Sequence, residues 1–185
     1  MLDRNQDFGT LTDGRTLRLE RLLPGPIERV WSYLTDPAKR RLWLAAGDTI
    51  AADGARVAFV WNNAHLSRAD DLPPPEYAGA NQEHSLVCTV TDYDPPHRLS
   101  FTWGEAKADA SEVTFELEPA GERVRFILTH SRLPDPGFRL SVSSGWHAHV
   151  AMLVAELEGE PAESFWSLHR RLKADYAARI GDMPM

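Results

Sequence analysis

The sequence predicts an α+β domain in which a curved antiparallel sheet wraps around one long helix near the C-terminus. Two observations support this fold class. A series of short segments alternates apolar and polar residues, as half-buried strands do, and from Ser144 onward the apolar period changes to that of a helix. The chain has 185 residues, 43% of them hydrophobic, which suits one domain with its own core.

The strands are predicted from period-two alternation and from the turns between them. In the first segment Leu17 and Leu19 share one face, while Arg18 and Glu20 share the other. Asp-Gly, Asp-Pro-Pro and Pro-Ala-Gly sequences separate the later segments. The predicted strands cover residues 15–22, 55–62, 85–93, 98–103, 112–118 and 123–131, and an edge strand is considered near Thr49.

Two short helices are predicted between the first and second strands. Apolar residues recur at helical spacing from Ile27 to Leu34, and Asp36 and Pro37 end that helix. A second short helix follows through Trp43.

The long helix is predicted from Ser144 to the stop at Gly159, with a length of about 20 Å. An additional helix begins at Pro161. We therefore divide the chain into a domain over residues 1–159 and a C-terminal helix within residues 160–185. The stripe of that helix is too apolar for water, so it must pack on its own domain or on a second copy, and we favour a homodimer. The stripe consists of Phe165, Leu168, Leu172 and Tyr176.

Charge and cysteine content narrow the partners and the compartment. A net charge of -7 repels phosphate backbones, and we read the short Arg40-Arg41 cluster as a solvated helix face, so nucleic acid is not expected as a partner. Cys88 is the single cysteine, so no disulfide forms within the chain. No apolar leader and no stretch of about 18 apolar residues is present, so we expect a cytoplasmic protein without a membrane span.

Three segments resemble one protein family. They are VWSYLTDPAKRRLW at 30–43, DYDPPHRLSFTW at 92–103 and SGWHAHVAMLVAEL at 144–157. In this order they resemble the activator of heat shock protein 90 ATPase homologue family of the START-like (SRPBCC) superfamily, over about residues 15–158. The resemblance implies a helix-grip fold, like that of the birch-pollen allergen, with a cavity between sheet and long helix. Two departures are an insertion at residues 68–83 and the added C-terminal helix.

The candidate cavity residues are the inward members of the strands and the long helix, which are largely aromatic and aliphatic. Asn63 and His65 belong to this set only if their strand continues past Trp61. The set comprises Phe59, Trp61, Asn63, His65, Phe101, Trp103, Phe126, Leu128, His130, Trp146, His149, Val150 and Leu153.

His130 and His149 are the candidates for catalysis, although an inward histidine is more commonly a core residue with a satisfied hydrogen bond. His147 and His149 lie two apart on a helix and do not face one another, so we expect no metal site. The carboxylates near Asp71 are read as solvated. No phosphate-binding loop, HExxH motif or nucleophile elbow is present, so no cofactor is expected.

Three functions remain open. The first is non-catalytic binding of a small, largely hydrophobic molecule, which the apolar lining favours. The second is a cyclase-, dehydratase- or hydrolase-like enzyme that uses His130 or His149. The third is a co-chaperone-like or self-association module that uses the insertion and the C-terminal helix.

Overall fold

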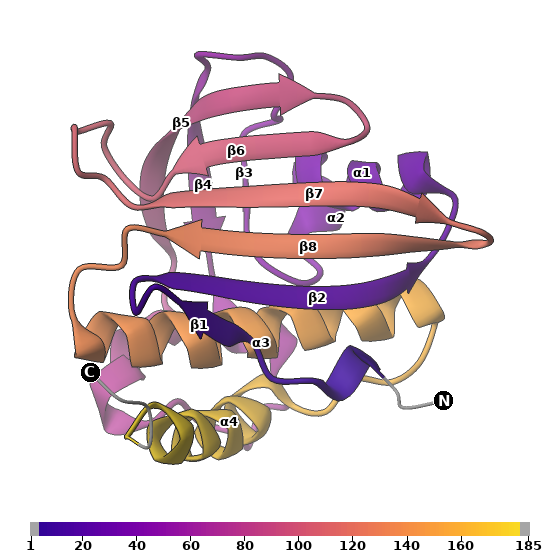
Figure 1. Ribbon diagram of the computed structural model, residues 1–185. Coiled ribbons are helices and arrows are strands. Elements are labelled where there is room, and N and C mark those ends of the chain that lie inside the picture. The colour runs from indigo at the N-terminus through magenta and orange to yellow at the C-terminus, as the bar shows by residue number, and fades with distance from the viewer. Residues whose placement is uncertain (1–3, 182–185) are drawn as a thin grey trace.

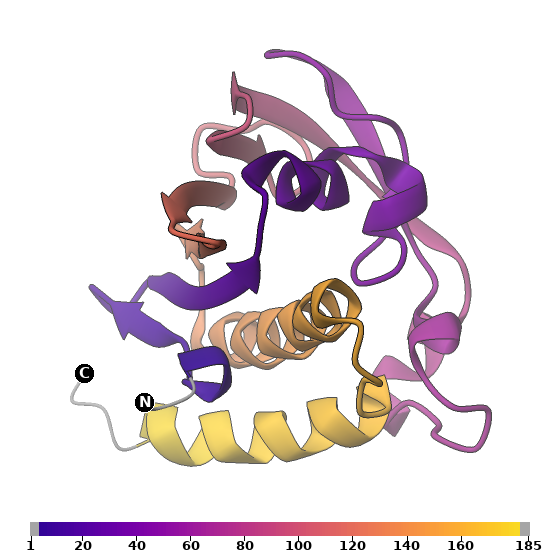
Figure 2. The same ribbon diagram turned by 90° about the vertical axis from the view of Figure 1, so that its right-hand side faces the viewer.

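The computed structural model describes residues 4–181 and contains an eight-stranded antiparallel sheet that curls around the helix α3 (Figures 1 and 2). The strand order is β1-β2-β8-β7-β6-β5-β4-β3. The strands are β1 (Thr10–Thr12), β2 (Thr16–Pro24), β3 (Ala46–Gly47), β4 (Arg56–Trp61), β5 (His84–Asp94), β6 (Arg98–Thr102), β7 (Glu112–Ala120) and β8 (Arg123–Ser131). The helices are α1 (Ile27–Thr35), α2 (Pro37–Arg40), α3 (Pro136–Glu158) and α4 (Phe165–Gly181), with 3-10 turns η1 (Arg4–Gln6), η2 (Asn63–Leu66) and η3 (Pro75–Asn81). This arrangement confirms the predicted α+β helix-grip fold.

Helix α3 begins eight residues before the predicted start at Ser144. The Asp135 side chain accepts a hydrogen bond from the Phe138 backbone N–H at 2.9 Å, and Pro136 occupies the first helical turn. An Asp cap followed by Pro is a common helix start, and it was the missed signal. The 23 residues of the helix span about 34 Å rather than 20 Å. The two extra turns matter because they carry part of the candidate site.

Aromatic rings fill the deep part of the space between the sheet and α3. The ring of Phe101 lies 4.9 Å from that of Phe59 and 5.7 Å from that of Phe115, measured between centroids. Phe115 in turn contacts Phe126 on β8 and Trp146 on α3. Most of the predicted interior is therefore occupied by the protein itself.

The Arg40-Arg41 pair is not a solvated face, because Arg40 is fully buried while Arg41 is exposed. The guanidinium group of Arg40 lies over the ring of Phe59, 4.6 Å from its centroid. Burial lowers the pKa of Arg40 to about 10, so the side chain stays charged at neutral pH. Its nitrogens donate to the backbone carbonyls of Leu34, Thr35, Ala45, Ala46 and Asp48.

Helix α4 packs along α3 in both views (Figures 1 and 2). The hydroxyl of Tyr176 accepts a hydrogen bond from the Gly9 N–H at 2.8 Å and lies 3.1 Å from Nδ1 of His147. The whole apolar stripe of α4 is buried within one chain. The homodimer was expected because this stripe needed a partner, and its own domain already covers it. Dimerisation through α4 stays an untested prediction. Within residues 4–181 no helix has the length and apolar character needed to cross a membrane.

The insertion contains η3 and packs against α4 through Asp71, which is 5% exposed rather than solvated. Its carboxylate accepts hydrogen bonds from the Ser167 backbone N–H at 2.8 Å, the Ser167 hydroxyl at 2.9 Å and the Arg170 guanidinium at 2.5 Å. Burial raises the pKa of Asp71, but hydrogen bonds from Ser164, Ser167 and Arg170 outweigh it and lower the pKa to about 2. Asp71 therefore ties the insertion to the start of α4.

We expect Asp71→Asn to lower the free energy of unfolding by about 2 kcal/mol at pH 7, because a pKa lowered from 3.8 to about 2 corresponds to that stabilisation of the carboxylate. This stabilisation is complete above pH 3.8 and is lost as the pH falls toward 2. Urea unfolding measures it. The matched control is Asp70→Asn, since the neighbouring Asp70 is exposed; equal losses in both variants would contradict the role of Asp71.

Candidate functional site

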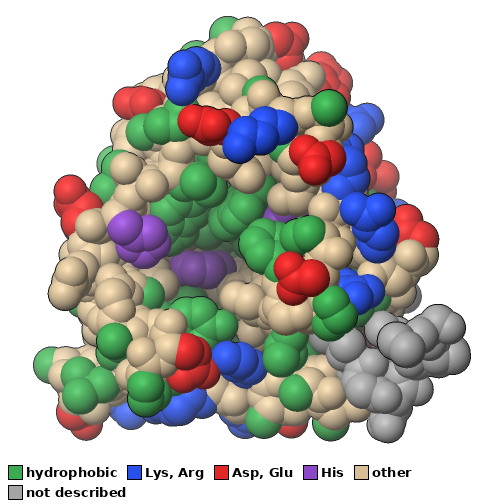
Figure 3. Space-filling model, turned by 90° about the vertical axis from the view of Figure 1, so that its left-hand side faces the viewer, with side chains coloured by type: hydrophobic (Ala, Val, Ile, Leu, Met, Phe, Trp, Pro, Cys, Tyr) green, Lys and Arg blue, Asp and Glu red, His purple; other side chains and the backbone are tan. Residues whose placement is uncertain are grey.

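A cavity of about 350 Å³ lies where the ends of β4, β5 and β6 approach the first half of α3. A second space of about 180 Å³ adjoins it, and the two share Trp61, Trp103, Ser141, Gly145 and His149 in their linings. Figure 3 shows the hollow at the surface, with hydrophobic side chains and histidines inside it and charged side chains around it. The size is at the lower end of the range of small-molecule sites.

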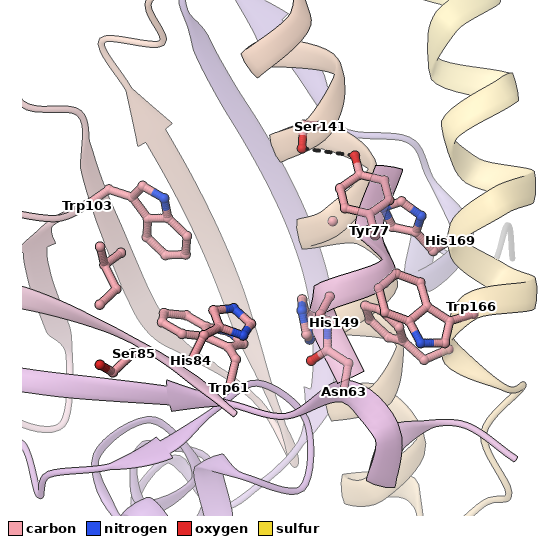
Figure 4. Close-up of a pocket in the computed structure, with 14 residues that line it drawn as sticks. Trp61, Asn63, Tyr77, His84, Ser85, Trp103, Ser141, His149, Trp166 and His169 are labelled. Atoms are coloured by element: carbon pink, nitrogen blue, oxygen red, sulfur yellow. Dashed lines mark hydrogen bonds between the residues drawn. The ribbon is translucent and has the colours of Figure 1, made fainter. Parts of the chain in front are cut away.

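Two aromatic walls face each other across the cavity (Figure 4). On the sheet side, Trp61 and Trp103 meet edge to face with 5.6 Å between their centroids. On the opposite side, η3 contributes Tyr77 and α4 contributes Trp166, whose rings stack 6.0 Å apart. The Tyr77 hydroxyl is 3.2 Å from that of Ser141 on α3. The insertion and the C-terminal helix, the two departures from the family pattern, thus build the outer wall of the cavity.

His149 presents a hydrogen-bond acceptor to the cavity. Its Nδ1 lies 2.7 Å from the carbonyl oxygen of Trp43, and because a carbonyl only accepts, Nδ1 carries the proton. Burial lowers the pKa of His149 to about 4, so the ring is neutral at pH 7. Its Nε2 therefore has a free lone pair, and it has no hydrogen-bond partner within residues 4–181.

Asn63 presents a second polar group. The strand β4 ends at Trp61, and the Asn62 side chain caps η2 by accepting from the Ala64 N–H, which turns Asn63 inward. Asn63 is 7% exposed, and its Oδ1 is buried without a hydrogen-bond partner. An unpaired buried acceptor costs about 1–3 kcal/mol.

The structure divides the predicted cavity residues into three groups. Those that line the two spaces are Trp61, Asn63, Trp103, Trp146 and His149. Those packed in the filled core, with exposures of 1% or less, are Phe59, Phe101, Phe126, Leu128, His130, Val150 and Leu153. The remaining residue, His65, lies at the surface with its Nε2 2.8 Å from the Arg41 carbonyl, because β4 ends before it.

His130 is held at both nitrogens by the core. Trp146 Nε1–H donates to its Nδ1 at 3.0 Å, and its Nε2 lies 3.0 Å from the hydroxyl of Ser111. Burial lowers the pKa of His130 to about 3. The ring is thus neutral and hydrogen-bonded at both nitrogens. This is the more common role expected for an inward histidine, that of a core residue with satisfied hydrogen bonds. His147 faces Tyr176 while His149 faces Trp43, so the two rings do not converge.

Sequence reasoning missed the residues of the outer wall. On α4, Trp166 and His169 lie beside the predicted stripe and are also buried, so this helix has two apolar sides rather than one. The breadth of that apolar surface was the available signal. Gly145 on α3 was read only as part of the family resemblance, yet a side chain at this position would project into open space.

The curled sheet around a long helix, with an aromatic cavity at one end, defines a helix-grip protein of the START-like SRPBCC superfamily. The family described as "Activator of Hsp90 ATPase homolog 1-like protein" matches residues 24–158. The chain therefore belongs to this family.

Solved structures share this fold. A Bordetella parapertussis protein solved by NMR is 40% identical, with a TM-score of 0.77, covering 94% of this chain and 91% of that one. CalU16 from Micromonospora echinospora is 18% identical, with a TM-score of 0.66 and 94% of each chain covered. A conserved protein from Enterococcus faecalis is 17% identical, with a TM-score of 0.67, covering 99% and 95%. No curated protein matches the chain.

Proposed function

We propose that this protein binds a small, largely hydrophobic molecule in the aromatic cavity and does not transform it. The observation that carries the proposal is an open space walled by aromatic rings from the sheet, η3 and α4. Aromatic side chains offer large apolar contact areas, and a few polar groups then orient the ligand. His149 and Asn63 are those groups here.

Enzyme activity through His149 is the alternative, since its Nε2 could accept a proton. A general base works best when its pKa lies near the working pH. Burial holds the pKa of His149 at about 4, and this makes it a weak base at neutral pH. The same nitrogen is well suited to accept a hydrogen bond, so binding is the better-supported function.

Filling the cavity should abolish binding without harming the fold. A Cβ at Gly145 meets nothing within 4 Å, so Gly145→Leu places its side chain in the cavity and also favours the helix. We expect the affinity for the neutral fluorescent probe N-phenyl-1-naphthylamine to fall at least about tenfold, a loss of about 1.4 kcal/mol. Fluorescence titration measures the affinity, and thermal unfolding checks that stability is retained.

The control for this experiment is Glu156→Leu, which adds leucine to an exposed position of the same helix. It should bind the probe as the wild type does. Wild-type protein that does not bind the probe, or a Gly145→Leu variant that binds it with unchanged affinity, would show that this cavity is not the binding site.

A further inference from the structure

One polar atom of the cavity lining, Nε2 of His149, specifies the hydrogen-bonding partner that it needs. The Trp43 carbonyl fixes the His149 tautomer, so Nε2 can only accept. Asn63 Oδ1 is also unpaired, but it has almost no accessible surface, so it is not an acceptor for a ligand. The hydroxyl of Tyr77 and the indole N–H of Trp166, by contrast, already have partners in Ser141 and Asn81. A ligand seated beside His149 therefore meets an acceptor that requires a donor.

The charge of the lining limits the ligand further. The residues that line the cavity include no Asp, Glu, Lys or Arg. A charged group moved into such a site would be left without a counter-ion, and an unpaired buried charge is strongly unfavourable. The two aromatic walls favour a flat ring that can lie against indole and phenol faces (Figure 4).

We infer that the ligand is a neutral, flat aromatic molecule with a hydroxyl or N–H group, and that this group donates a hydrogen bond to His149 Nε2. The inference rests on the proposed binding function and adds the chemical class of the ligand. His149 is thus the residue that distinguishes a donor-bearing ring from an equally hydrophobic ring without a donor.

Two probes of similar shape test this inference. 2-Naphthol carries an O–H donor, and 2-methoxynaphthalene is its methyl ether without one. We expect wild-type protein to bind 2-naphthol about tenfold more tightly, as one well-made hydrogen bond to a buried acceptor allows. In His149→Phe the preference should fall to about one while 2-methoxynaphthalene still binds. The control is His65→Phe, because His65 is exposed and lies outside the cavity; this variant should keep the wild-type preference.

A second measurement covers the case in which His149→Phe does not fold. In wild-type protein with ¹⁵N-labelled histidine, 2-naphthol should shift the Nε2 resonance of His149, whereas 2-methoxynaphthalene should not. Equal affinity for both probes, or an unmoved Nε2 resonance under saturating 2-naphthol, would overturn the inference and leave the binding function intact. Failure of both probes and of N-phenyl-1-naphthylamine to bind would overturn both.

Discussion

Replacing Arg40 with leucine should lower the free energy of unfolding by at least about 4 kcal/mol, one of the largest effects expected of any single substitution here. The guanidinium group donates to five backbone carbonyls between Leu34 and Asp48. Leucine leaves these acceptors buried and unpaired, at about 1–3 kcal/mol for each one that finds no water. It also removes the contact of the guanidinium with the face of Phe59. Chemical denaturation monitored by circular dichroism measures the loss.

The adjacent Arg41 provides a matched control, because it is the same residue type and is exposed. Arg41→Leu should change the free energy of unfolding by less than about 0.5 kcal/mol, as surface substitutions usually do. Similar losses for the two variants would mean that Arg40 does not organise the turn between α2 and β4.

The Arg40-Arg41 pair also shows a limit of sequence reasoning. Both residues are arginines, and an arginine is rarely fully buried, so the sequence gives no sign that one of them lies in the core. Arg40 is buried because the chain from Leu34 to Asp48 bends around it and directs backbone carbonyls toward its guanidinium group. That bend depends on how α1, α2 and β4 pack together, which a one-dimensional pattern does not contain.

The cavity illustrates the same limit. Alternation correctly placed Phe59 and Trp61 on one inward face of β4, and the helix stripe placed Trp146 and His149. Whether an inward side chain meets another ring or open space is decided by distant segments: Phe59 lies against Phe101, whereas Trp61 stands at the end of its strand. The outer wall joins the insertion to α4 across 96 residues through Asp71 and Ser167, and no local signal connects them.

Four buried histidines should make the protein unusually sensitive to acid. Burial is the main cause that lowers the pKa of His130 and His147 to about 3 and that of His149 and His169 to about 4, from 6.5. Below pH 6.5 the unfolded chain therefore binds protons that the folded chain does not. The stability that the four neutral histidines contribute is complete above pH 6.5, and it is lost as the pH falls toward 4 and then 3.

Each of these histidines should cost up to about 1.4 kcal/mol per pH unit over this range, or roughly 2 kcal/mol between pH 7 and pH 5. Summed over the four histidines, this loss approaches the whole free energy of unfolding of a typical domain, about 5–15 kcal/mol. We therefore expect cooperative unfolding near pH 5, and an acid titration monitored by tryptophan fluorescence measures it. Urea denaturation at a series of pH values gives the slope of stability against pH.

His169→Phe tests the cause of this acid sensitivity. The His169 ring lies among the rings of Tyr77, Phe165 and Trp166, and its Nδ1 is buried without a partner. Phenylalanine keeps the ring and removes the titrating nitrogen, so this variant should match or exceed wild-type stability at pH 7. Its slope should be shallower by about 1.4 kcal/mol per pH unit, the share of one histidine. The control is His97→Phe at an exposed position. A slope that His169→Phe leaves unchanged would mean that this histidine titrates alike in the folded and unfolded chains, and that acid acts through other groups.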